Sequence, residues 1–503
     1  MTDFLWGTAA LFGDLQTISI FAFALFGGML FGAIPGVNML TLGAVMLPFT
    51  ISMQPEHAVM LFSVIYCAGV FGGAITAILF NIPGAPENAP TCFDGYPMTT
   101  KGMAGKAIGA AVSFSALGGV ASAIIMMSAT PTIAKWAVTA FGPPEIFALI
   151  CFGLAVSASV GAANLWKGWM SIFIGLAIAS IGTDPVGGIP RFNDWSALGF
   201  SGASYYLSAG IHFIPVILGF FAVSEVFTQA QNIASGTRVR PKASLELPSL
   251  LEFWSVRFTA LRSIILGFFA GILPGIGSVL AAFLGYSQAV RWSKTPEKFG
   301  TGVLDGVVAS ETANNAATGA AMIPLLALGL PGGALTAMML GIFQIHGMEP
   351  GPLIFINSSD LVWITFAAMF WANVAILGLG WIQTKTVVHI LNVPFRWLAP
   401  GILLLAVIGA YALRNLLIDV WVMLVAGIVG YFLRRTGYSA AGIVLGLILG
   451  KIGESAFAKS MQLLDYSFID LVSRPIAGIL IAAAVITVIS GVWREIIRYR
   501  QAS

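Results

Sequence analysis

Charge is scarce in this 503-residue chain. Asp, Glu, Lys and Arg together make up 9% of its residues, whereas a soluble domain carries about 25%. So few charges cannot cover a soluble surface, so most of the chain must face lipid or other helices. The chain has no stripe of basic residues that would indicate nucleic-acid binding, so no nucleic-acid partner is expected. We therefore expect an all-α polytopic membrane protein with the lipid bilayer as its surroundings.

Cysteine and histidine are also rare. Cys67, Cys92 and Cys151 are isolated, and the four histidines form no cluster. Neither pattern is typical of a metal centre or a disulfide framework. The chain has no catalytic triad, zinc-protease, P-loop or dinucleotide motif, so neither an enzyme activity nor an organic cofactor is expected. The first Lys or Arg is Lys101, and this lack of a basic N-terminal region predicts no cleavable signal.

Glycine and proline, in contrast, are abundant, with 58 and 24 residues. In a bilayer such residues are tolerated where the freed backbone groups are buried in protein or line a cavity. That pattern suits a transporter better than a passive anchor. A span needs about 20 apolar residues. Apolar segments lie near 17–34, 38–53, 58–82, 107–130, 145–163, 168–182, 206–228, 263–273, 276–290, 303–330, 353–384, 398–413, 416–433, 439–451 and 475–493.

One long polar stretch, 229–262, separates these segments into two sets and contains five basic residues. We predict a first transmembrane repeat in 1–228, a cytoplasmic basic linker in 229–262 and a second transmembrane repeat in 263–503. Three landmarks recur in the same order, as a duplicated unit requires. They are Pro35-Gly36 and Pro274-Gly275 at an offset of 239, Pro83-Gly84 and Pro331-Gly332 at 248, and Pro144 and Pro400 at 256.

Loop charges indicate how the two repeats are oriented. Basic residues in short loops favour the cytoplasm. The second half has three Lys or Arg residues in the loop 291–298, whereas the equivalent loop of the first half, 54–57, has none. In another pair of equivalent loops, Lys101 of the first half has His346 as its counterpart in the second. One further pair of equivalent loops keeps a lysine in both halves. The alternation predicts inverted-topology repeats with an external N-terminus.

The first pair of breaks predicts re-entrant helical hairpins, because the apolar runs on either side are too short to cross alone. Pro35-Gly36 interrupts 17–53, and Pro274-Gly275 interrupts 263–290. After each tip a returning half-helix presents free N–H groups and a partial positive charge, which can bind an anion without any Lys or Arg. An ordinary kink between closely packed helices is the alternative. The candidate substrate-binding residues here are Gly36, Asn38, Gly275, Gly277 and Ser278.

The second pair of breaks predicts discontinuous helices. Three prolines within 81–91 argue against regular helix there, and 328–336 is the mate of this stretch. Unwound carbonyls suit Na⁺, and unwound N–H groups suit a carboxylate. For 85–100 the alternative is an external loop that leaves Glu87, Asp94 and Lys101 solvated. The candidate substrate-binding residues are Pro83, Gly84, Pro331, Gly332 and Gly333, and the candidate Na⁺ ligands are Asn81, Pro83, Leu330 and Pro331.

Asn314 and Asn315 follow Glu311 in a segment of small residues. Amides within a membrane must find partners, so these two are either substrate or cation ligands or interhelical hydrogen-bonding groups. Glu311 becomes a functional candidate if it lies deep. No Lys or Arg occurs in 31–90, 263–290 or 299–384. A carboxylate there requires helix N-termini, amides, hydroxyls and a co-bound cation, Na⁺ or H⁺.

These motifs together resemble the large membrane subunit (TctA-type) of the tripartite tricarboxylate transporter family, over nearly the whole chain. The matching stretches are Gly32-x-x-Pro35-Gly36, Asn81-Ile-Pro-Gly-x-Pro86, Asp94-Gly-Tyr-Pro97, Gly142-Pro-Pro-Glu145, Gly271-x-x-Pro274-Gly275, Glu311-x-Ala-Asn-Asn315, Leu330-Pro-Gly332, His346-Gly-x-x-Pro-Gly-Pro352, Asp419-Val-Trp-Val422 and Arg434-Arg435-x-Gly437-Tyr438. The chain departs from the family at Val37-Asn38, where a glycine is usual, and at Glu87, where small residues are usual.

The resemblance implies cation-coupled uptake of di- or tricarboxylates at the bacterial inner membrane. It also implies two partners, a small membrane subunit and a periplasmic solute-binding protein. By analogy with other transporters that contain hairpins, we expect an elevator-like movement. An intramembrane enzyme or scaffold and a passive anion channel are the alternatives.

Overall fold

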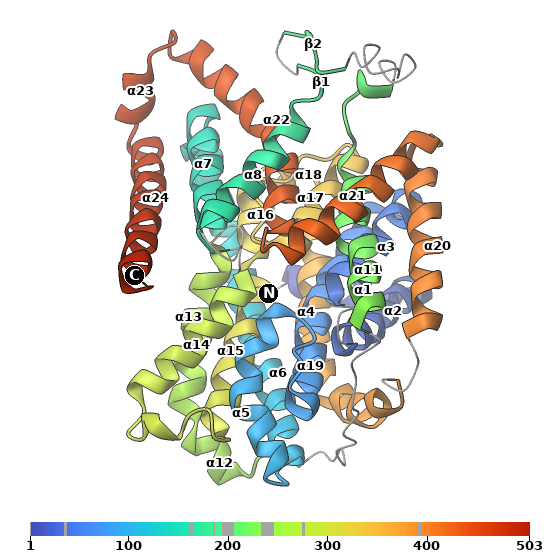
Figure 1. The fold of residues 1–503 in the computed structure, drawn as a ribbon, viewed down its shortest axis with the longest axis vertical. Coiled ribbons are helices and arrows are strands. Elements are labelled where there is room, and N and C mark those ends of the chain that lie inside the picture. The colour runs from blue at the N-terminus through green and yellow to red at the C-terminus, as the bar shows by residue number, and fades with distance from the viewer. Residues whose placement is uncertain are drawn as a thin grey trace. The chain divides into compact units, whose positions relative to one another are not determined.

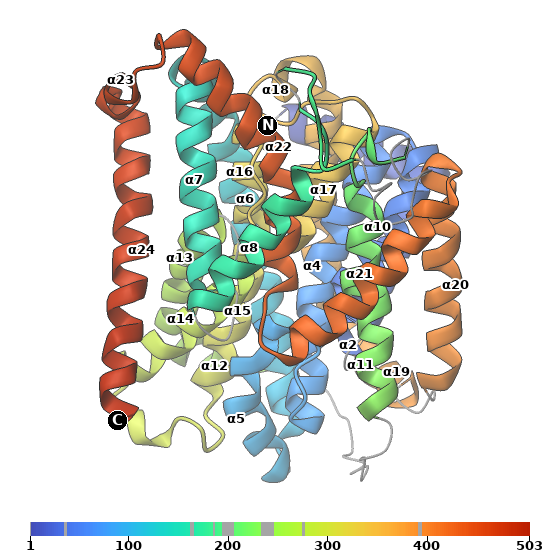
Figure 2. The same cartoon turned by 45° about the horizontal axis from the view of Figure 1, so that its top comes forward.

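The computed structural model of the chain describes residues 2–34, 38–160, 165–184, 187–193, 206–232, 246–273, 277–390 and 395–502. Nearly all of them are helical (Figure 1, turned by 45° in Figure 2). The described residues contain a single sheet, in which β1 (Gly182–Thr183) pairs antiparallel with β2 (Pro190–Arg191). Within the same residues, nine helices are long and apolar enough to cross a membrane. The predicted all-α polytopic class is confirmed.

The described chain forms two compact units. Unit 1 comprises 2–134, 225–273 and 277–405, and unit 2 comprises 135–224 and 406–502, with the gaps given above. Each unit therefore draws on both halves of the sequence.

Unit 1 holds most of the helices, wholly or for the greater part. They are α1 (Thr2–Gly13), α2 (Leu15–Ala33), α3 (Met39–Met46), η1 (Leu47–Ser52), α4 (Pro55–Phe80), η2 (Pro86–Asn88), α5 (Ala89–Thr100), α6 (Ala104–Ala140), α11 (Ser224–Asn232), α12 (Leu250–Ser255), α13 (Arg257–Ile272), α14 (Gly277–Trp292), η6 (Pro296–Lys298), α15 (Leu304–Ala320), α16 (Met322–Leu328), α17 (Ala334–Ile345), α18 (Ile354–Asn357), α19 (Ser359–Ile390) and α20 (Phe395–Arg414).

Unit 2 holds the rest. They are α7 (Pro143–Val160), α8 (Leu165–Ala179), α10 (Phe213–Ile217), the π-helical turn η4 (Leu218–Val223), α21 (Leu417–Arg435), α22 (Ala440–Leu463), α23 (Phe468–Ser473) and α24 (Pro475–Ala502).

The two halves pack their first helices in the same way. A Cβ built on Gly32 of α2 would lie 2.3 Å from the carbonyl oxygen of Gly69 in α4, and one built on Gly271 of α13 would lie 2.6 Å from that of Ala317 in α15. These contacts repeat at offsets of 239 residues in the first helix and 248 in the second, which are the sequence offsets. A second set of contacts follows the same offsets: Gly28 with Ile65, and Gly267 with Ala313.

The ends of equivalent helices repeat as well. Helices α4 and α16 stop at residues in the left-handed region, Asn81 with φ 56° and Gly329 with φ 72°, again at an offset of 248. Left-handed backbone at this place ends a helix, and glycine or asparagine adopts it at least cost. The second break predicted in each half is therefore built by the same local geometry.

Unit 2 is held by close helix contacts and by ion pairs. A Cβ on Gly175 of α8 would lie 2.0 Å from the carbonyl oxygen of Ile443 in α22, so only glycine allows this approach. The buried carboxylate of Glu145 accepts the N–H of Gly142 at 2.9 Å and the Nε of Arg474 at 2.5 Å. The family-like Gly142-Pro-Pro-Glu145 stretch is thus a helix start that also ties α7 to α24.

Candidate functional site

The candidate site is the part of unit 1 where the four predicted breaks lie. Gly36 and Gly275, at the two hairpin tips, fall outside the described residues. Their neighbours Asn38 and Gly277 begin the returning helices α3 and α14 and are described. Helices α13 and α14 pack along each other as the two arms of a hairpin, which both views show (Figures 1 and 2).

Each unwound break packs on the hairpin of its own half. A Cβ on Gly84 would lie 2.0 Å from the carbonyl oxygen of Gly32, near the end of α2. In the second half, a Cβ on Gly277 would lie 3.3 Å from the carbonyl oxygen of Gly332. A Cβ on Gly84 would also lie close to Gly73, and a Cβ on Gly332 close to Ala321, which is the residue equivalent to Gly73. The glycines after Pro83 and Pro331 are therefore needed for close approach of two backbones.

Each break also contacts the returning helix of the other half. The turn η2 lies against α14, and α17 lies against α3, where Leu335 reaches Gly43. A Cβ on Gly277 of α14 would lie 3.4 Å from the hydroxyl oxygen of Tyr66 in α4. The two breaks and the two returning helices, called the ring below, are thus linked by contacts within unit 1. The sequence named all four elements, and the structure brings them together.

Asn38 acts as the N-cap of α3. Its Oδ1 accepts the N–H groups of Leu40 at 3.0 Å and Thr41 at 3.3 Å. Two of the donors that we expected to be open to an anion are therefore held by the side chain itself in this state. An anion at this helix start would bind the Asn38 amide, or displace its oxygen from the two N–H groups.

Asn314 and Asn315 are fully buried in α15 and belong to one hydrogen-bonded network. Asn314 donates through Nδ2 to the backbone oxygen of Glu87 at 3.2 Å, and Asn315 donates to Asn314 Oδ1 at 2.8 Å. Asn315 Oδ1 has no partner among the described residues. The bond from Asn314 to Glu87 is interhelical, whereas Asn315 donates within α15, to Glu311 and Asn314. The Asn315 oxygen is still available to a ligand.

Glu311 lies at the centre of this network with no exposed surface. Its carboxylate accepts Thr91 Oγ1 at 2.5 Å and Ser115 Oγ at 3.0 Å, and the amides of Asn88 and Asn314 at 3.4 Å each. The four donors come from α5, α6, η2 and α15 itself, so this deep carboxylate joins the first break to the second half. These four donors offset part of the cost of burying the charged form of this carboxyl group.

Sequence reasoning missed Thr91, Ser115, Asn88 and Tyr66. Each is a single polar residue in an apolar or proline-rich stretch, and nothing local marks it. The signal that could have found Tyr66 is the repeat itself, since Tyr66 is the counterpart of Asn314 at the offset of 248.

The stretch 85–100 is not a solvated loop, so that alternative is wrong for its acidic residues. Glu87 is 3% exposed and Asp94 is not exposed at all, whereas Lys101 is exposed. Regular helix also begins earlier than the three prolines suggested, at Ala89. Pro90 lies in the first turn of α5, where a missing N–H costs no helical hydrogen bond.

Asp94 fixes the entry to α15. Its Oδ1 accepts the N–H groups of Gly300 at 2.9 Å and of Gly302 and Val303 at 2.8 Å, and its Oδ2 accepts the Tyr286 hydroxyl at 2.9 Å. One buried carboxylate thus anchors the loop that precedes Glu311 and the asparagine pair, and it contacts α14 as well.

The predicted Na⁺ ligands differ in their surroundings. Asn81 is exposed and ends α4, Pro83 is half-buried, and Leu330 and Pro331 are buried. No backbone N–H of the described residues donates to the carbonyls of Pro83 or Pro331. Within the described ranges no three His, Cys, Asp or Glu side chains are grouped as a transition-metal site would require. The unwound carbonyls are the oxygen ligands that a hard cation prefers.

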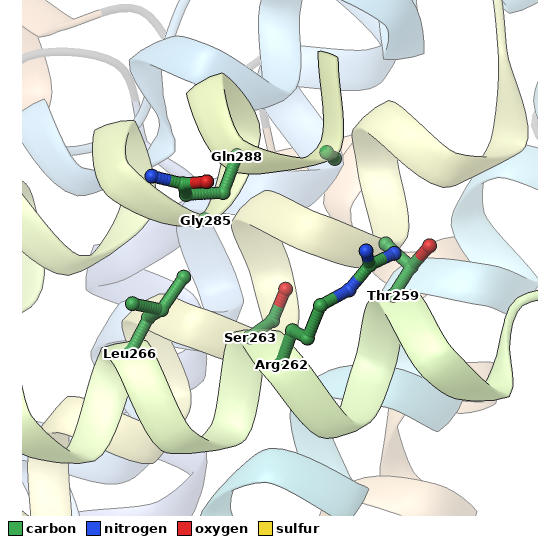
Figure 3. A pocket seen from close by; sticks show the side chains of 7 residues that line it. Thr259, Arg262, Ser263, Leu266, Gly285 and Gln288 are labelled. Atoms are coloured by element: carbon green, nitrogen blue, oxygen red, sulfur yellow. The ribbon is translucent and has the colours of Figure 1, made fainter. Parts of the chain in front are cut away.

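A recess lies between α13 and α14, and the residues that line it do not belong to the four breaks (Figure 3). Its one cation, Arg262, lies over the Trp292 ring at 4.8 Å, and Thr259 donates to Asp305 at 2.6 Å. None of the predicted site residues lines this recess, which is bordered by Thr259, Arg262, Ser263, Leu266, Gly285, Gln288 and Ala289.

Comparison with known proteins identifies the family. Residues 18–445 match the model of the tripartite tricarboxylate transporter TctA family. A protein of Agrobacterium vitis, described as an uncharacterized 52.8 kDa protein in the TAR-I ttuC' 3' region, is 35% identical over 463 residues, which cover 92% of this chain and 90% of that protein. A second, from the TAR-II ttuC' 3' region of the same organism, is 37% identical over 223 residues, 44% of this chain and 92% of its own length.

No solved structure matches the chain. The family match spans most of the sequence and includes both halves, so the resemblance found in the motifs is confirmed. The chain is a multi-pass membrane protein that belongs to the tripartite tricarboxylate transporter TctA family, whose members are large transporter subunits.

Proposed function

We propose that this chain is the permease subunit of a cation-coupled secondary transporter for di- or tricarboxylate anions. The observation that carries the proposal is the ring formed by the two unwound breaks and the two returning helices in unit 1. A transporter needs irregular backbone at membrane depth, and such backbone is tolerated only where it is buried or lines a cavity.

The substrate-binding groups of the ring are neutral. Ser278 and the first N–H groups of α14, the amides of Asn38, Asn314 and Asn315, and the backbone around Gly84, Gly332 and Gly333 are the proposed ligands. A helix N-terminus offers about half a unit of positive charge. Two returning helices therefore compensate about one negative charge, and a dianion needs a further cation.

That cation is the source of coupling. With no Lys or Arg in 31–90, 263–290 or 299–384, substrate and cation each bind poorly without the other, because an uncompensated charge in a low-dielectric site is costly. Na⁺ on the unwound carbonyls near Pro83 and Pro331, or a proton, supplies the missing charge. The gradient of this cation then drives uptake.

An elevator-like movement is the mechanism that we favour. The described residues fall into two compact units, and every described member of the ring belongs to unit 1. This division supports a mechanism in which one unit carries the substrate and the other serves as the scaffold. The inverted orientation of the two repeats, with 229–262 on the cytoplasmic side, belongs to the same proposal.

The partners follow from the family. A tripartite transporter has further subunits, and we propose a small membrane subunit and a periplasmic solute-binding protein, with this chain in the bacterial inner membrane. The solute-binding protein would deliver the carboxylate to the ring.

The test is uptake into proteoliposomes that contain the chain with both partner subunits. We expect citrate or succinate to accumulate above the external concentration when an inward Na⁺ or H⁺ gradient is imposed, and not without it. Equilibration without accumulation would favour a passive channel. Binding of neither acid under any gradient would contradict the proposed function.

A further inference from the structure

Glu87, in the first break, and Glu311, in α15 beside it, differ in how they are solvated. Glu311 receives four side-chain hydrogen bonds. Glu87 is 3% exposed. Its Oε1 has no partner among the described residues. A buried carboxylate oxygen without a donor is unfavourable as an anion, and a proton on that carboxyl removes the charge.

Nothing in the packing requires a carboxyl group at this position. The counterpart of Glu87 at the offset of 248 is Leu335, which is 2% exposed and lies against Gly43 of α3. The same place in the other half of the ring thus accommodates an apolar side chain. The fold therefore does not require an acid at this position.

The turn of Glu87, η2, packs against the described helices α4, α5, α14 and α15. These four helices carry a single Lys or Arg between them. Arg291, the one basic residue on α14, lies 14 residues beyond Gly277, about 20 Å along the helix. The titratable or charged groups on the four elements are Glu56, His57, Tyr66, Cys67, Cys92, Asp94, Tyr96, Tyr286, Arg291, Asp305 and Glu311.

Some of these groups are already hydrogen-bonded. Asp94 is bonded to Tyr286, and Asp305 to Thr259. The turn η2, which carries Glu87, contacts the returning helix α14.

We propose that Glu87 is the proton-coupling residue of this transporter, and that it takes up one proton when a carboxylate anion binds in the ring. This rests on the proposed function of the same site. The bound anion and ionised Glu87 would repel each other across a low-dielectric space, so binding favours the protonated acid. The proton comes from hydronium in the solvent: one of its O–H bonds breaks, which leaves water, and an O–H bond forms on a carboxylate oxygen of Glu87.

Linkage fixes the direction of the pH effect. If binding takes up one proton, the affinity for the substrate rises as pH falls, by about tenfold per pH unit over the range where free Glu87 is ionised. Glu87→Gln resembles the protonated acid permanently. We expect this variant to bind the substrate with an affinity that is independent of pH, and Glu87→Leu, which copies Leu335, to do the same.

The experiment uses the purified full-length chain in lipid nanodiscs, with citrate and succinate as the probes. Binding is measured by calorimetry between about pH 7 and pH 9, where simple carboxylic acids are largely ionised, at fixed Na⁺. Proton uptake is read in a weak buffer with a pH indicator. Glu297→Gln, at an exposed position in η6, is the matched control, and a thermal melt establishes that each variant is folded.

We expect about one proton per substrate for the wild-type chain and for Glu297→Gln, and none for Glu87→Gln. Proton uptake that persists in Glu87→Gln would overturn the assignment to Glu87, as would a folded Glu87→Gln that no longer binds. Binding by the wild type that depends on Na⁺ but not on pH would show that the cation is not a proton. If the wild type binds neither acid, the proposed function itself fails.

Discussion

Replacement of Glu311 tests whether one carboxylate holds the ring together. In Glu311→Ala the two short bonds from Thr91 and Ser115 are lost, each worth about 1.5–3 kcal/mol because the acceptor is charged. Thr91 still contacts Ser310 at 3.0 Å, and the Asn88 amide still donates to Val70 at 2.9 Å.

The Ser115 hydroxyl has no second partner among the described residues, so it is the group left buried and unsatisfied. Removal of the buried charge recovers part of the loss, and we expect Glu311→Ala to destabilise the chain by about 3 kcal/mol.

Glu311→Gln should cost much less, about 1 kcal/mol. Its amide oxygen can still accept Thr91, and the Ser115 hydroxyl can turn to accept from its NH₂ group. The assay is chemical or thermal unfolding of the purified variants in one detergent, with Glu297→Gln as a surface control. Equal stability of Glu311→Ala and the wild type, or a larger loss in Glu311→Gln than in Glu311→Ala, would refute the closed network described here.

Three other predictions follow from the ring. Gly332→Ala should lower transport, and should lower stability by about 1–3 kcal/mol, because the new Cβ would lie 2.9 Å from Ala321. The control is Gly333→Ala, whose Cβ meets nothing within 4 Å and which should melt like the wild type. Equal melting temperatures for the two variants would contradict the close packing. Asp94→Asn replaces an acceptor for three N–H groups, and we expect hydrogen exchange in 300–303 to quicken, while unchanged exchange would argue against the anchor. Alanine at Asn38, Asn314 or Asn315 should abolish uptake in at least one folded variant, and normal uptake by all three would leave these amides a structural role alone.

Local chemistry explains why the breaks could be predicted from the sequence. Pro83-Gly84 and Pro331-Gly332 interrupt apolar runs, and proline and glycine act on the backbone wherever they occur. The repeat offsets read from these landmarks recur as packing contacts, as for Gly32 with Gly69 and Gly271 with Ala317. Features that depend on neighbouring residues can therefore be predicted from the sequence alone.

The polar interior was not predictable in the same way. Glu87 and Asp94 stand among prolines and resemble a solvated loop, and contacts with residues more than 200 positions away help to bury them. Ser115 is one serine in a long apolar helix until α15 brings Glu311 to it. The interleaving of 135–224 with 406–502 in unit 2 also depends on distant contacts, and no local pattern encodes it.

The most direct test of the account is the structure of the chain with a bound carboxylate. We expect the carboxylate groups to lie in unit 1 between the starts of α3 and α14 and the two unwound breaks, about 2.7–3.1 Å from backbone N–H, amide or hydroxyl donors. No Arg or Lys should contact them. A substrate held by an arginine or lysine side chain, or bound away from these four elements, would contradict the account.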